Sequence, residues 1–97
     1  MRDRALVDPA TLHLPPSRSN GADPLKLSRQ FARYGTSLEG MPPPEVKRGS
    51  DGKLVIFDGV TRAKRVAKYL PGTIITVEVT GALTKPVGGL PVVGEKL

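Results

Sequence analysis

Residues 53–65 constrain the fold of this chain most, because the hydrophobic period changes there at a single turn. Residues 54–57 form an uninterrupted apolar run rich in β-forming side chains, which is typical of a strand covered on both faces. Asp58 and Gly59 follow and predict a tight turn, since glycine tolerates a positive φ and aspartate accepts bonds from its own turn. We therefore expect a strand over 53–57 that ends at this turn.

A helix with one apolar and one basic side is predicted over 61–70. Its apolar positions recur at the spacing of one helical stripe, and its basic side carries Arg62, Lys64, Arg65 and Lys68. A helix start after a glycine turn offers free N–H groups and the positive end of the helix dipole, which favours an anion. With Arg62 beside those donors, we expect a phosphate to bind here. A solvated basic face is the alternative interpretation.

The composition limits the classes of function. The chain has 97 residues, enough for one small domain, and 15 Lys and Arg against 9 Asp and Glu give a net charge of +6. This excess favours nucleic acid, nucleotides or an acidic protein as partner. The chain has no cysteine, which excludes disulfides, a thiolate nucleophile and a cysteine-based zinc site. We expect no membrane span and no secretory signal within it.

Capping and alternation predict the remaining elements. Asp23 as N-cap and Pro24 at the first position predict a helix over 24–34. Residues 1–11 are mixed and charged, and residues 1–4 are expected to be a frayed start or the place where a longer parent was cut. The other expected elements are a short strand at 12–14, a hairpin of strands 45–48 and 53–57, a half-buried strand over 74–79, and an irregular tail 81–97 that wraps the body.

These elements predict one α+β domain over 1–97, with its core in 12–80. We expect a mixed sheet of three to four strands with two main helices on it. If strands 53–57 and 74–79 are parallel neighbours, the helix between them forms a right-handed crossover. A ligand would then bind at the carboxyl end of strand 53–57.

Three residues are candidates for a catalytic base. His13 is the only histidine, although a histidine between two leucines also suits a structural role. Asp58 lies in the predicted phosphate turn, where making the turn is its alternative role. Glu45 starts the first hairpin strand. Residues 17–22 are expected to be a polar loop, in which Arg18 lies between two serines and is a further candidate phosphate contact. A flexible connector is the alternative interpretation of this loop. Tyr34 and Tyr69 are candidates either to stack on a base or to pack at the rim.

The order of elements, together with Gly59-Val60-Thr61-Arg62 and residues 43–46 and 51–56, resembles the N-terminal domain of the ParB/sulfiredoxin superfamily over about residues 12–80. In that family a Gly-x-x-Arg box at a helix start binds nucleotide phosphates. The resemblance implies that Gly59 lets a phosphate approach the backbone closely, that the Thr61 hydroxyl donates a hydrogen bond and that Arg62 binds phosphate. We add Arg65 and Arg18 to this predicted phosphate-binding set because they extend the basic surface.

The chain also departs from that family. The reductase branch needs a cysteine just before the box, so that reaction is excluded. The CTPase and kinase branches have an acid where this chain has Val60, and a hydrophobic side chain cannot bind magnesium. Asp58 is the candidate replacement. The cofactor stays open, with magnesium accompanying a nucleotide as one alternative.

A second resemblance comes from Gly-Met-Pro-Pro-Pro at 40–44, Asp-Gly-Val-Thr-Arg at 58–62 and Leu-Pro-Val-Val-Gly at 90–94. These are similar to ParB-like C-terminal toxin modules of bacterial Rhs and polymorphic secreted proteins. The resemblance implies a nuclease or nucleotide-directed toxin, delivered to a target-cell cytoplasm by a larger secreted protein and neutralised by an acidic immunity protein. The alternatives are a non-catalytic nucleotide- or DNA-binding module and a basic partner-binding domain.

Overall fold

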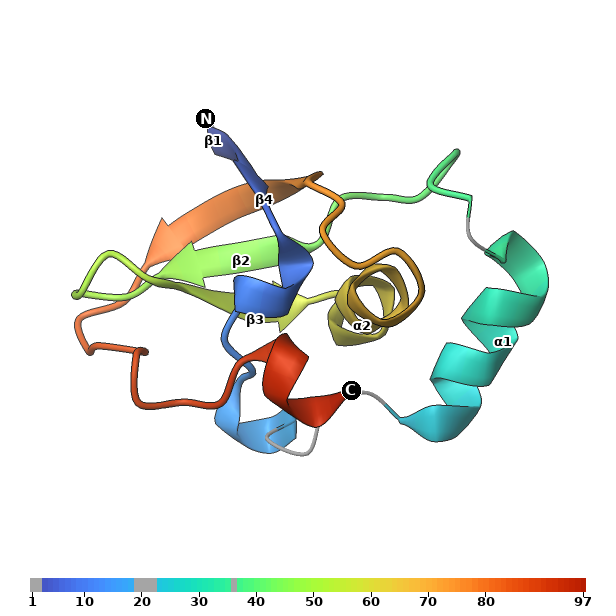
Figure 1. Ribbon diagram of the computed structural model, residues 1–97. Coiled ribbons are helices and arrows are strands. Elements are labelled where there is room, and N and C mark those ends of the chain that lie inside the picture. The colour runs from blue at the N-terminus through green and yellow to red at the C-terminus, as the bar shows by residue number, and fades with distance from the viewer. Residues whose placement is uncertain (1–2, 19–22, 36) are drawn as a thin grey trace.

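The computed structural model describes residues 3–18, 23–35 and 37–97. It is a small α+β domain with one four-stranded mixed sheet and two α-helices, which confirms the predicted fold class (Figure 1). The elements are β1 (Asp3–Val7), α1 (Pro24–Tyr34), β2 (Glu45–Arg48), β3 (Leu54–Asp58), α2 (Val60–Tyr69) and β4 (Ile75–Ala82), with short 3-10 helices η1 (Pro9–Thr11), η2 (Pro16–Arg18) and η3 (Val93–Lys96). Residues 1–2 and 19–22, parts of the predicted frayed start and polar loop, lie outside the described ranges.

The strands lie in the order β1-β4-β2-β3. β2 pairs antiparallel with β3, which confirms the predicted hairpin, and it pairs parallel with β4 on its other edge. β3 and β4 are therefore separated by β2 and run in opposite directions. A right-handed crossover required β3 and β4 to be parallel neighbours, and this condition is not met. The short turn at 49–52 pairs β2 with β3, and β2 then lies between β3 and β4.

The expected frayed start is wrong for residues 3 and 4, which belong to a strand over residues 3–7. This segment is β1, which pairs antiparallel with β4 from Asp3 opposite Val79 to Val7 opposite Ile75. An edge strand of this kind is held by backbone bonds to the free edge of a longer strand, so its own side chains need no strong strand pattern. The Arg4 guanidinium adds an ion pair to Glu78 at 3.6 Å.

β3 is an edge strand of the sheet and is not covered on both faces along its length. Val55 and Ile56 are buried, but Phe57 is 63% exposed. The outer edge of β3 is covered at one point by His13, whose N–H donates to Leu54 O at 3.0 Å and whose carbonyl accepts from Ile56 N–H at 2.9 Å. The short strand predicted at 12–14 is thus reduced to His13, which forms two isolated bridges, a parallel one to Val55 and an antiparallel one to Val92.

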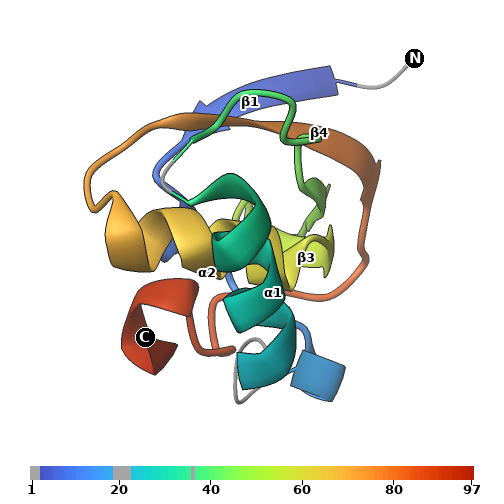
Figure 2. The ribbon, with the colours of Figure 1, turned by 90° about the vertical axis from the view of Figure 1, so that its right-hand side faces the viewer.

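The hydrophobic core forms between α2 and the sheet. It contains Leu12, Leu14, Val46, Ile56, Val60, Ala63, Val66, Ala67, Ile75, Val77 and Val93. Figures 1 and 2 show α1 packed beside α2, away from the sheet, and Leu27 is the buried residue of α1. Among the described residues, no helix has the length and apolar character needed to cross a membrane.

The tail is tied to the β2–β3 hairpin by Asp51. Its carboxylate accepts from Gly88 N–H at 2.8 Å, from Val87 N–H at 3.3 Å and from Lys53 N–H at 3.3 Å. Partial desolvation raises the pKa of Asp51, but these backbone donors outweigh it and hold the pKa below the ordinary value of 3.8. The predicted wrapping tail therefore has a defined anchor.

Candidate phosphate-binding site

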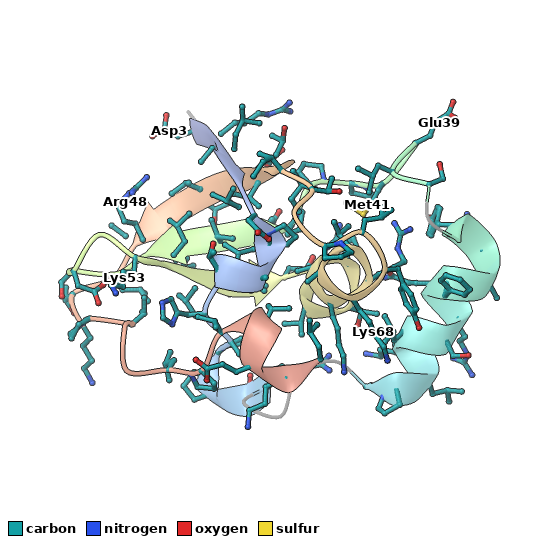
Figure 3. All side chains as sticks on the ribbon, in the orientation of Figure 1. Asp3, Glu39, Met41, Arg48, Lys53 and Lys68 are labelled. Carbon is teal, nitrogen blue, oxygen red and sulfur yellow. The ribbon has the colours of Figure 1, made fainter. Side chains whose placement is uncertain are left out.

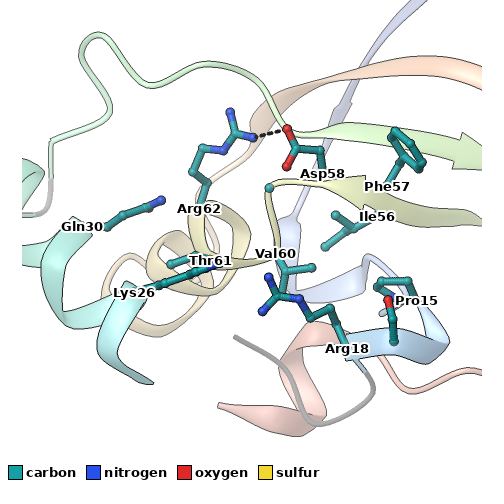
Figure 4. A pocket seen from close by; sticks show the side chains of 12 residues that line it. Pro15, Arg18, Lys26, Gln30, Ile56, Phe57, Asp58, Val60, Thr61 and Arg62 are labelled. Carbon is teal, nitrogen blue, oxygen red and sulfur yellow. Dashed lines mark hydrogen bonds and ion pairs between the residues drawn. The ribbon is translucent and has the colours of Figure 1, made fainter. Parts of the chain in front are cut away.

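A cavity of about 510 Å³ lies at the carboxyl end of β3, where the chain turns into α2 (Figure 4). Three separate parts of the chain form its walls. They are Pro15, Ser17 and Arg18 around η2, Lys26 and Gln30 on α1, and residues 56–62 across the end of β3 and the start of α2. The predicted turn thus opens onto a hollow, rather than being covered by the described chain.

Gly59 determines the backbone path at this turn. Its φ is 107°, in the left-handed region that side chains rarely adopt. A Cβ at this position would lie 3.0 Å from Pro44 Cα and 3.0 Å from the Arg62 Nη2 atom. Both the conformation and the close approach therefore require glycine here.

The start of α2 leaves backbone donors at the cavity. The first intrahelical bond runs from Ala63 N–H to Gly59 O, at 2.9 Å. The N–H groups of Val60, Thr61 and Arg62 precede that bond and have no intrahelical acceptor. Within residues 3–18, 23–35 and 37–97, no side chain caps this helix end. All three residues line the cavity, so these donors and the positive end of the helix dipole lie at its wall.

Three cationic side chains line the same cavity. In Figure 4, Lys26 and Arg18 extend from α1 and η2 toward the first turn of α2. Neither forms an ion pair within the described part of the chain. Arg62 extends to the other side of the turn, where its Nη2 lies 3.2 Å from Asp58 Oδ2 and its Nη1 donates to Pro42 O at 3.3 Å.

Asp58 is the one carboxylate among the described residues that line the cavity. Its side chain is 69% exposed, whereas that of Arg62 is 16% exposed. The pair is therefore open to solvent on the Asp58 side, and an exposed ion pair of this type contributes little stability. An incoming anion can compete with Asp58 for the Arg62 guanidinium.

Two lining residues on α1 were missed by the sequence analysis. Lys26 and Gln30 are four residues apart and so share one face of the helix. The Gln30 Oε1 atom is buried and has no hydrogen-bond partner among the described residues. The spacing was visible in the sequence, but the direction of that face depends on how α1 docks on α2.

His13 and Glu45 do not line this cavity. His13 is 8% exposed; its backbone is bonded to β3, and its Nδ1 lies 2.8 Å from Leu90 O, so the residue joins β3 to the tail. Glu45 begins β2 and is paired in register with Asp58. Of the three candidate bases, the structure places only Asp58 in the wall of the cavity.

Arg65 is also outside the cavity, and it is 1% exposed. Its Nη1 donates to Gly35 O at 2.9 Å and to Ser37 O at 2.8 Å, and its Nη2 lies 3.0 Å from the sulfur of Met41. Figure 3 shows Met41 above α2. Burial lowers the pKa of its guanidinium. Arg65 thus joins α2 to the segment after α1, and we remove it from the candidate phosphate-binding set for this reason.

The structure brings the residues of the Gly-x-x-Arg box together with Arg18, which is distant in the sequence. Gly59, Thr61, Arg62 and Arg18, all predicted from the sequence, line the one cavity. Comparisons with protein-family models, with curated proteins and with solved structures gave no significant match for this chain. The resemblance to the ParB/sulfiredoxin superfamily therefore stays a prediction, and function has to be argued from the cavity itself.

Proposed function

We propose that this chain binds the phosphate of a nucleotide or a nucleic acid in the cavity at the start of α2. One observation carries the proposal: an uncapped helix start and the side chains of Arg18, Lys26 and Arg62, from three segments of the described chain, line a single cavity. Three cations against the one carboxylate of Asp58 leave an excess of positive charge there. The net charge of +6 agrees with an anionic ligand.

In this proposal the backbone and the side chains have separate roles. The N–H groups of residues 60–62 donate to phosphate oxygens, and Gly59 lets the phosphate approach the backbone closely. Arg18 and Lys26 neutralise the charge from the opposite wall. Arg62 exchanges its bond to Asp58 for a bond to the phosphate, since charge-assisted hydrogen bonds to phosphate are strong.

The position of Asp58 beside Arg62 in the cavity wall supports a second candidate function, that of a toxin-type enzyme that acts on nucleic acid or a nucleotide. A carboxylate beside a phosphate-binding arginine can serve as a general base, while Arg62 and the helix start stabilise the developing charge. If magnesium accompanies a nucleotide, Asp58 would hold it together with phosphate oxygens. The described residues contain no group of three or more His, Asp or Glu side chains that would hold a metal by themselves. An acidic immunity protein remains the expected partner of such an enzyme.

Binding can be tested by isothermal titration with nucleoside triphosphates and with a short oligonucleotide. We expect Arg18→Ala and Lys26→Ala each to weaken binding by roughly tenfold, because a hydrogen bond to a charged group contributes about 1.5–3 kcal/mol. Arg29→Ala is the matched control, since Arg29 is exposed on α1 and does not line the cavity. Equal losses in all three variants would show that only the overall charge matters. No binding by the unmodified chain would refute the proposal.

A further inference from the structure

An apolar groove of about 440 Å³ adjoins the phosphate cavity. Pro15, Ile56 and Phe57 line both hollows, so the two are continuous around the end of β3. The rest of the groove is formed by Val55 on β3 and by apolar side chains of the segment 83–90. Two lysines, Lys47 and Lys85, also line it.

Phe57 is the unusual residue of this groove. It is a large apolar side chain near the carboxyl end of the edge strand β3, and it is 63% exposed. Figure 4 shows that Phe57 and Ile56 leave β3 on opposite sides, so Ile56 joins the core and Phe57 does not. The Nζ atom of Lys47 lies 4.6 Å from the centre of the Phe57 ring. A cation thus lies over the ring of Phe57, whose side chain is otherwise exposed.

The continuous hollow has the order cation, aromatic ring, cation. Arg18 and Lys26 line the cavity at one end, Phe57 lies where the two hollows meet, and Lys47 and Lys85 line the groove. Proteins that bind single-stranded nucleic acid combine a positively charged groove with aromatic rings on which bases stack. The groove is therefore complementary to a strand whose phosphates alternate with unpaired bases.

We propose that the cavity and the groove form one site for single-stranded nucleic acid. One phosphate lies at the start of α2, the neighbouring base stacks on Phe57, and the next phosphate lies at Lys47 and Lys85. This inference rests on the proposed function and narrows its ligand to a strand of at least two nucleotides. A mononucleotide would leave both groove lysines without a phosphate, and a duplex would not offer a free base face to Phe57.

The test is fluorescence anisotropy with a short fluorescein-labelled oligothymidylate, competed by thymidine monophosphate and by a duplex of the same length. We expect Phe57→Ala to weaken binding at least fivefold, in line with the roughly 1–3 kcal/mol per base measured for stacking. Phe57→Trp should retain affinity, because it keeps a ring for stacking. Phe57 is exposed, so these variants should fold, and their unfolding curves check this.

Salt dependence gives a second readout for the lysines. Lys85→Ala should reduce the slope of log affinity against log salt by about 0.7, the value expected for one phosphate contact on a single strand. The matched controls are Leu6→Ala, an exposed apolar residue on β1, and Lys68→Ala in the last turn of α2. Neither residue lines the cavity or the groove, so both variants should bind like the unmodified chain.

The outcomes separate this inference from the proposal on which it rests. If Arg18→Ala weakens binding but Phe57→Ala and Lys85→Ala do not, the phosphate cavity stands and the strand site is refuted. The strand site is also refuted if thymidine monophosphate or the duplex competes as well as the single strand. If the unmodified chain binds none of these ligands but binds a nucleoside triphosphate, the strand site is refuted and the phosphate cavity stands. If it binds no nucleoside triphosphate either, both proposals are refuted.

Discussion

Gly59 is the single residue that makes the cavity at the start of α2 possible. Its positive φ turns the chain from β3 into α2, and its missing side chain leaves room beside Pro44 and Arg62. The neighbours Thr61 and Arg62 are fixed by this turn because they are local in sequence. Local chemistry of this kind is what a sequence reveals, which explains why the box was predicted and then found in the cavity wall.

Asp58 offers a test of whether the site only binds or also catalyses. Asp58→Asn removes the competitor for Arg62 and a like charge near the phosphate, so ligand affinity should rise, by roughly threefold or more. The free energy of unfolding should change by less than about 1 kcal/mol, because the pair is exposed. Titration calorimetry and urea unfolding measure the two quantities.

The same variant separates the two candidate functions in cells. If Asp58 is a general base, expression of the unmodified chain in a bacterial cytoplasm is toxic and Asp58→Asn relieves the toxicity while binding is kept. Arg62→Ala should relieve it as well, by loss of binding. A falling affinity in Asp58→Asn would contradict the competition between Asp58 and the ligand. Toxicity that persists in this variant would contradict a catalytic role for Asp58.

Helices and strands whose signals are local in the sequence were predicted, whereas a strand that depends on a distant partner was not. The bounds of α1 were predicted at 24–34 because the residues that begin and end the helix, Asp23 and Gly35, directly flank it in the sequence. The hairpin was predicted because a short turn joins its strands. β1 was missed because it forms on the free edge of β4, which lies about 70 residues away.

The same reason explains the residues that were missed or misplaced at the site. Lys26 and Gln30 reach the cavity through the docking of α1 on α2. Arg65 was predicted on the basic face, but the chain after α1 folds over it and uses its donors. Phe57 was predicted as part of a covered strand and is exposed because it leaves β3 on the side opposite Ile56, away from the core. Each outcome depends on which elements become neighbours.

The anchor between the hairpin and the tail should respond to pH. The pKa of Asp51 is lowered in the folded chain, so this group stabilises the fold above its ordinary pKa of 3.8 and loses that contribution as the pH falls through the lower folded value. Asp51→Asn should therefore be less stable than the unmodified chain at neutral pH, and the difference should shrink below pH 3.8.

Thermal unfolding across this pH range measures the effect. Glu39→Gln, on the exposed segment between α1 and β2, is the matched control and should show no such pH-dependent difference. A difference between Asp51→Asn and the unmodified chain that grows toward acid would contradict the assigned role of the carboxylate.

At the scale of the whole molecule, the described chain has two hollows that meet at the end of β3. The cavity is formed by η2, α1 and the start of α2, and the groove by β3 and the tail. The cavity and the groove form one continuous surface because they share three lining residues, Pro15, Ile56 and Phe57. The basic charge of the chain and this surface together favour an anionic, extended ligand.

We propose that backbone N–H groups at the start of α2 bind a phosphate, and a titration of the ¹⁵N-labelled chain with an oligothymidylate, followed by amide chemical shifts, tests this. We expect the largest shifts at the amides of residues 60–62, and we expect Arg18→Ala to move the titration to higher ligand concentration. Saturable binding with those three amides unshifted, and the shifts centred elsewhere in the chain, would contradict it.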